Sequence, residues 1–152
     1  MKKFYILSSV LILIDRVVKI LVQNFLTSNE LFIIKNFFYI TYVKNIGAAF
    51  SIFEGMQLIF ILLGIIVSSY ILYYVKKYSI NNIGYAMLLS GVIGNIIDRI
   101  VFGYVIDYLG FIIFNRYMPI FNLADSLIVV GAILIFIKGD VIKNGKRTVD
   151  WI

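Results

Sequence analysis

The chain has 152 residues and a net charge of +6; 62% of the residues are hydrophobic and only 14% are charged. A soluble domain of this length could not bury so much apolar surface, since soluble proteins carry about 25% charged residues. The composition therefore indicates a multi-pass membrane protein with one domain. The absence of cysteine and histidine excludes disulfides, thiol nucleophiles, zinc sites built on these residues and Ser-His-Asp triads.

Four apolar segments predict membrane-spanning helices, each close to the length of about 20 residues that a bilayer requires. The predicted spans are about 4–22, 56–75, 83–101 and 119–137. Ser90, Gly91 and Gly94 are small residues at which a neighbouring helix can approach the third span closely. Pro119 suits the first turn of the fourth.

The segment 24–55 is more polar, and its β-branched and aromatic residues predict two short strands. Residues 103–118 are expected to form a loop or a strand pair. The predicted fold is therefore membrane all-α: a four-transmembrane-helix bundle with a small extracytoplasmic β-sheet between helices one and two. The whole chain, 1–152, is expected to form a single integral membrane domain.

The basic residues predict the orientation of this bundle. With four spans, both termini lie on one side, together with eight of the fourteen basic residues: Lys2, Lys3, Lys76, Lys77, Lys138, Lys143, Lys146 and Arg147. The positive-inside rule makes that side cytoplasmic. The positive charge therefore orients the protein in the membrane, and no nucleic-acid partner is expected.

Polar residues gather near the outer ends of the third and fourth helices. Asn95, Asp98 and Arg99 share one helix face by their spacing, as do Asn122 and Asp125, and Asp107 lies in the connection between them. Ionisable residues within a membrane are candidates for function. Two facing carboxylates cannot easily both ionise, so one can act as a base and the other as an acid, as in aspartic proteases.

The spacing alone leaves two questions open. It does not identify which two of the three aspartates form the pair, although Arg99 beside Asp98 makes that carboxylate the better structural candidate. The aspartates could instead form only buried hydrogen bonds and a salt bridge to Arg99. Asp15 and Lys19 lie four residues apart on the first helix and are expected to pair. That pair either neutralises itself inside the bundle or helps to shape the site.

Five short motifs together resemble lipoprotein signal peptidase, the bacterial signal peptidase II family. They are GNIIDR at 94–99, GYVIDY at 103–108, FNLADS at 121–126, NIGAAF at 45–50, and Asp15 with Lys19. The likeness extends over the whole chain in length, spans, orientation and motif order. One departure is Tyr108, where phenylalanine is more usual, and the sequence gives no reason to expect a chemical effect.

The resemblance implies that Asp107 and Asp125 are the catalytic pair. It also implies that a second group of residues supports the pair or contacts substrate: Asp15, Lys19, Asn45, Gly47, Asn95, Asp98, Arg99 and Asn122. The expected substrate is a prolipoprotein that carries diacylglycerol on its cysteine and is cut just before that cysteine. The expected enzyme is a monomer among membrane lipids of the bacterial cytoplasmic membrane, with its site near the outer face and no cofactor or metal.

Two alternatives follow from the same residues. Ser51 lies seven residues after Lys44, which allows a serine–lysine peptidase, although no recognisable context surrounds these two. A small proton-coupled carrier could use the aspartates as a relay, but carriers usually show repeats and broken helices, which this sequence lacks.

Overall fold

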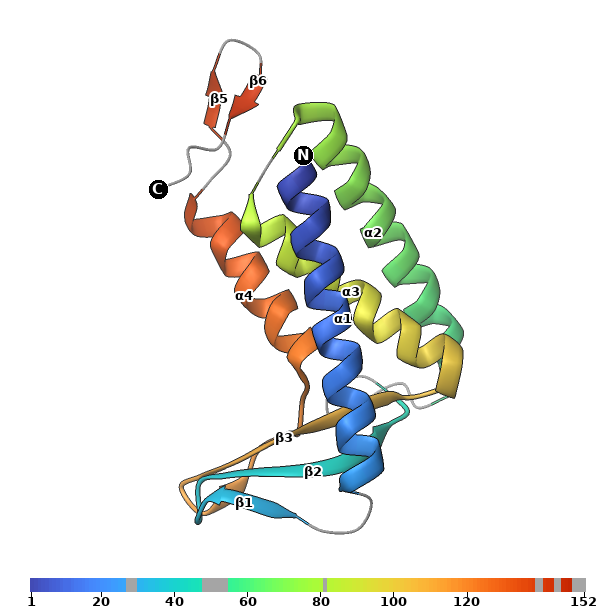
Figure 1. Ribbon diagram of the computed structural model, residues 1–152, viewed down its shortest axis with the longest axis vertical. Helices are drawn as coiled ribbons and strands as arrows, with labels where there is room; N and C mark the ends of the chain where they lie inside the picture. The colour runs from blue at the N-terminus through green and yellow to red at the C-terminus, as the bar shows by residue number, and fades with distance from the viewer. Residues whose placement is uncertain (27–29, 48–54, 81, 139–140, 144–145, 149–152) are drawn as a thin grey trace.

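A bundle of helices with a β-sheet across one end forms the protein (Figure 1). The computed structural model describes residues 1–26, 30–47, 55–80, 82–138, 141–143 and 146–148. In these ranges the four helices are α1 (Lys2–Phe25), α2 (Gln57–Tyr78), α3 (Ile83–Phe102) and α4 (Leu123–Lys138). The N-terminus lies at the end of the bundle away from the sheet, as does the hairpin of β5 (Val141–Lys143) and β6 (Lys146–Thr148).

Helix α3 packs against each of the other three helices and is the most buried of them. Its small residues make this possible, since a Cβ added at Gly91 would lie 2.2 Å from the carbonyl oxygen of Ala124 in α4. At Gly94 an added Cβ would lie 2.7 Å from a carboxylate oxygen of Asp15 in α1. The predicted role of these glycines in close packing is confirmed.

The outer surfaces of the helices are apolar. Helix α2 buries Ser68, Ile71 and Val75 and exposes large side chains such as Leu58 and Ile66. On length and composition, α2 and α3 could each cross a membrane, and α4 is a shorter apolar helix. Helix α1 contains charged residues in its second half, but Asp15 and Lys19 are both buried.

Residues 103–118 form a strand pair, one of the two alternatives predicted for them, and this pair makes the sheet larger than the one predicted between helices one and two. It has four antiparallel strands in the order β1 (Leu31–Ile34), β2 (Phe38–Asn45), β3 (Val105–Ile113) and β4 (Arg116–Tyr117). Half of its strands thus come from the connection between α3 and α4, not from the segment between helices one and two. The location predicted for the sheet was therefore incomplete, because β3 hydrogen-bonds to β2 across a long separation in sequence that local patterns do not reveal.

Helix α4 begins at Leu123, later than the predicted start near 119. Phe121 is held in an extended conformation by backbone hydrogen bonds to Leu109 of β3, so the helix cannot start before it. Some predicted features lie outside the described residues: Ala48, Ala49 and Phe50 of the NIGAAF motif, Ser51, and part of the polar tail.

Candidate active site

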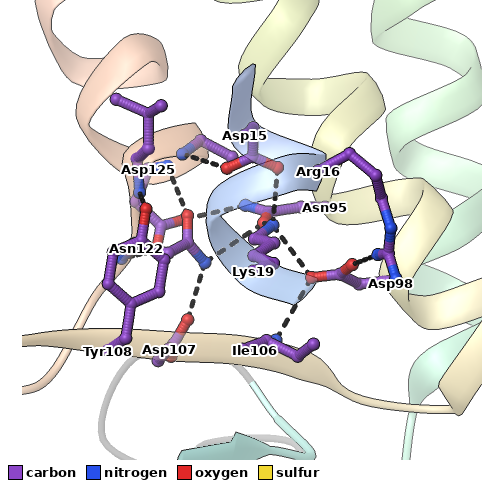
Figure 2. A network of polar contacts seen from close by, with 12 residues as sticks. Asp15, Arg16, Lys19, Asn95, Asp98, Ile106, Asp107, Tyr108, Asn122 and Asp125 are labelled. Atoms are coloured by element: carbon purple, nitrogen blue, oxygen red, sulfur yellow. Dashed lines mark hydrogen bonds and ion pairs between the residues drawn. The ribbon is translucent and has the colours of Figure 1, made fainter. Parts of the chain in front are cut away.

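The first turn of α4 holds Asp125 through a reciprocal pair of hydrogen bonds with Asn122 (Figure 2). The Asn122 side-chain oxygen accepts from the backbone N–H of Asp125 at 2.9 Å, and Asp125 Oδ2 accepts from the Asn122 N–H at 3.2 Å. This is a capping box, in which the cap and the third helical residue satisfy each other's backbone donors. Asp125 is half-buried and its carboxylate is fixed at the helix start.

Strand β3 brings Asp107 to the same point. The Asn122 side-chain amide donates to Asp107 Oδ1 at 2.6 Å, and the Asn45 amide from β2 donates to Oδ2 at 2.8 Å. Burial raises the pKa of the Asp107 carboxyl to about 7, and the negative charge of Asp125 adds to this effect. The two amide hydrogen bonds act in the opposite direction, because they stabilise the ionised carboxylate.

Asn95 of α3 connects this pair of carboxylates to α1. Its Nδ2 donates to Asp125 Oδ1 at 2.8 Å, and its Oδ1 accepts from Asn122 Nδ2 at 3.3 Å. The same oxygen also accepts from Lys19 Nζ at 3.2 Å. The two carboxylates are thus held by three asparagines from three different parts of the chain.

A buried ion network lies directly behind these asparagines (Figure 2). Lys19 pairs with Asp15 at 2.9 Å, which confirms the predicted pair, and with Asp98 at 2.8 Å. Arg16 pairs with Asp98 at 2.6 Å. Asp15 also accepts from the backbone N–H of Ala124 at 3.1 Å, so the pair does more than neutralise itself: it contacts the start of α4.

The predicted association of Arg99 with Asp98 is wrong. The cations beside Asp98 are Arg16 and Lys19, and Asp98 Oδ2 also accepts from the Ile106 N–H at 3.2 Å. Arg99 lies on another side of α3, where it donates to the Gly47 carbonyl at 3.3 Å and covers the Phe60 ring. Adjacent residues on a helix point about 100° apart, so Asp98 and Arg99 meet different neighbours.

A cavity of about 1060 Å³ opens beside the carboxylates. Asp107, Asp125, Asn45, Asn95 and Arg99 form its polar wall. Much of the remaining lining is apolar and comes from the sheet, α2, α3, α4 and the segment before α4, including Val43, Ile46, Phe60, Ile96, Ile128 and Val129. The cavity thus combines a polar end with a long apolar wall between α2 and α4.

The structure brings together the residues that the sequence singled out. Gly47 joins this group through two hydrogen bonds: its carbonyl accepts from Arg99, and its N–H donates to the side-chain oxygen of Asn45. Sequence reasoning missed Arg16 and Tyr108. Arg16 carried a usable signal, since it is a third charge within an apolar helix. Tyr108 carried none, because its hydroxyl meets the Leu123 N–H only in the folded chain.

The fold is similar to that of two solved structures of bacterial membrane enzymes. One has a TM-score of 0.80 at 29% identity, covering 90% of this chain and 87% of the other. The second has a TM-score of 0.79 at 29% identity, covering 90% of this chain and 92% of the other. The fold and the carboxylate cluster at its end therefore define a class, that of a small bacterial membrane enzyme.

The sequence comparisons are more specific. Residues 7–139 match the signal peptidase (SPase) II family. The lipoprotein signal peptidase of Halothermothrix orenii is 42% identical over 137 residues, which cover 88% of this chain and 92% of the relative. That of Bacillus pumilus is 37% identical over 150 residues, covering 95% and 96%. This chain belongs to the signal peptidase II family, whose members are aspartic peptidases.

Proposed function

We propose that this chain removes signal peptides from prolipoproteins and that Asp107 and Asp125 are its catalytic pair. One observation carries the assignment of the pair: both carboxylates line the cavity and both are hydrogen-bonded to Asn122. Asp98, the third candidate, is buried between two cations and a backbone donor and does not line the cavity.

The pair works by sharing one proton. The ionised carboxylate removes a proton from a water molecule, whose oxygen attacks the scissile carbonyl carbon. The protonated partner gives its proton to the carbonyl oxygen, and the tetrahedral intermediate then collapses as a proton passes to the leaving nitrogen. Burial and the charge of Asp125 raise the pKa of Asp107, which supports Asp107 as the member that carries the shared proton.

The remaining site residues orient this pair or contact substrate. Asn45, Asn95 and Asn122 hold the carboxylates through the hydrogen bonds described above. Asp15, Lys19 and Asp98 form the ion network behind them. Arg99 lines the cavity and donates to the Gly47 carbonyl, and among the described residues its guanidinium has no carboxylate within ion-pair distance.

The proposed substrate carries a diacylglyceryl group on the cysteine that follows the cleaved bond. The apolar wall of the cavity, formed by residues such as Phe60, Ile96 and Val129, suits an acyl chain and an apolar signal helix. Each buried methylene contributes about 0.8 kcal/mol to membrane partitioning, so two chains anchor the mature side of the bond firmly. Such anchoring holds the scissile bond beside the aspartates.

The proposed setting is the cytoplasmic membrane of a bacterium. The chain forms one monomeric membrane domain that spans the bilayer four times, with both termini in the cytoplasm and the sheet at the outer face. The burial of Asp15 and Lys19 supports a spanning α1, since its lipid-facing residues, such as Leu13 and Val17, are apolar. The basic residues Lys2, Lys3, Lys76 and Lys77 lie at the helix ends away from the sheet.

Isosteric substitution tests the catalytic pair. Asp107→Asn and Asp125→Asn should each remove almost all cleavage, because an amide cannot cycle the proton. The double variant should be no slower than either single one, since the two residues act as a unit. Cleavage of a labelled lipopeptide in detergent measures the rates, with Glu30→Gln, an exposed carboxylate outside the site, as the control. Near-normal turnover in either single variant would remove the assignment.

A paired assay tests the substrate. One precursor is offered with and without its diacylglyceryl group in the same detergent, and only the modified form should be cut efficiently. Changes in the mature sequence beyond the first few residues should have little effect. Equal cleavage of both forms would contradict lipid anchoring and favour a general membrane protease.

A further inference from the structure

The start of α4 is unusually well satisfied for a helix end. The first N–H groups of a helix have no acceptor within the helix. In α4 the side chains of other residues accept from them: Asp125 from Asn122, Asp15 from Ala124, and Asn122 from Asp125. The remaining donor, the Leu123 N–H, is bonded to the hydroxyl oxygen of Tyr108 at 3.2 Å.

Tyr108 is the neighbour of Asp107 on β3 and is buried, with 4% of its surface exposed. Its ring packs in an apolar cluster with Val22, Ile106 and Leu123, among others. Burial raises the pKa of the hydroxyl, so the side chain stays neutral at physiological pH. The hydroxyl does not line the cavity and so has no direct part in binding or chemistry.

We propose that Tyr108 is a positioning residue for the aspartate pair, through the hydrogen bond that ties the first turn of α4 to strand β3. The inference rests on the proposed role of Asp107 and Asp125. Strand β3 carries Asp107 and α4 carries Asp125, so any contact that fixes these two elements to each other also fixes the distance between the carboxylates.

The geometry gives the hydroxyl a distinct role in that connection. The backbone of Phe121 is already bonded to Tyr108 and Leu109 of β3, at 2.7 to 3.1 Å. The Asn122 side-chain amide also reaches β3 by donating to Asp107, but that bond runs through a rotatable side chain. The bond at Leu123 holds the backbone of the turn itself, two residues before Asp125, and thereby limits rotation of the turn about Phe121. Catalysis by oriented groups is sensitive to displacements of about 1 Å.

Phenylalanine at this position keeps the ring that packs in the apolar cluster and removes only the hydroxyl. The expected effect is therefore a moderate loss of rate and not its abolition. Tyr108→Phe should lower kcat about fivefold, which corresponds to about 1 kcal/mol of barrier, with KM unchanged. The substrate contacts the cavity and not Tyr108, so binding has no reason to weaken.

Tyr104→Phe is the matched control. Its hydroxyl meets the Tyr42 hydroxyl at 3.0 Å, and its ring packs against the same apolar cluster. The Tyr104→Phe variant therefore loses a hydroxyl from the same region but keeps every hydrogen bond to α4. Its kcat should stay within twofold of that of the unmodified enzyme. Equal losses of kcat in the two variants would overturn the proposal, as would an effect of Tyr108→Phe on KM alone or no effect at all.

Removing the donor provides an independent arm. Leu123 is the first residue of α4, a position where proline fits without breaking a helix. Leu123→Pro should lower kcat by at least the same factor, and adding Tyr108→Phe to it should cause no further loss. A further fivefold loss in the double variant would overturn the proposal. If the assignment of Asp107 and Asp125 as the catalytic pair is wrong, cleavage will survive Asp125→Asn. That result is distinct from any outcome for Tyr108→Phe.

Discussion

The side-chain amide of Asn122 lies between the two carboxylates and contacts both of their elements. Its nitrogen donates to Asp107 and its oxygen caps the Asp125 N–H, so neither a carboxylate nor an alkyl group could replace it. An amide is the side chain that donates and accepts at once without adding charge. At this position an added negative charge would face two carboxylates in a buried setting.

The same logic predicts how Asn45 sets the pH dependence of cleavage. Its hydrogen bond stabilises the ionised form of Asp107 and so lowers the pKa of that carboxyl. In Asn45→Ala the pKa of Asp107 should rise, and the fall in kcat at alkaline pH, where the pair loses its shared proton, should move to higher pH. The pH profile of kcat measures the shift. Asn24→Ala, at an exposed amide of α1, is the control. A shift to lower pH would contradict the expectation.

At the scale of the elements, the contact between α3 and α4 depends on glycines. An added Cβ at Gly91 would clash with the backbone of Ala124, next to Asp125. At Gly84 it would meet the backbone oxygen of Gly131, farther along α4, at 2.9 Å. Both sites are close backbone approaches, but only the first lies at the turn that carries Asp125.

Gly91→Ala and Gly84→Ala should therefore differ in their effects. Each should destabilise the protein by about 1–3 kcal/mol, the usual cost of overpacking. Gly91→Ala should also lower cleavage per folded molecule, because it displaces the first turn of α4. Thermal unfolding and kcat in the same detergent separate the two effects. Equal kcat values for the two variants would show that the position of this turn does not limit the rate.

At the scale of the whole molecule, the sheet lies at one end of the bundle, and the N-terminus lies at the other (Figure 1). Reporter fusions at Lys77 and at the C-terminus should read cytoplasmic, and fusions near Lys35 and Asn115, in the turns of the sheet, should read external. The physical reason is the positive-inside rule applied to the basic helix ends. An external C-terminus would require an odd number of spans and would contradict the proposed topology.

Much of this molecule follows from the sequence alone. Long apolar runs bounded by charge and turn residues determine helices, because a spanning segment must satisfy its own backbone. The family follows from its motifs, and the Asp15–Lys19 pair follows from helical spacing. The glycines at which helices pack closely could also be identified from the sequence, because a residue without a side chain inside an apolar helix marks a place where another backbone can approach.

Only the tertiary structure decided which distant groups meet. The pairing of β3 with β2 depends on backbone hydrogen bonds between segments that are far apart in the chain, so the full sheet could not be read locally. The late start of α4 follows from the backbone hydrogen bonds of Phe121 to β3, and the Tyr108 hydrogen bond joins the same two segments. The packing of α3 likewise places Asp98 against Arg16 and Lys19 and leaves Arg99 at the cavity. Sequence spacing shows which residues share a face of one helix, but it does not show which residues of other elements that face contacts.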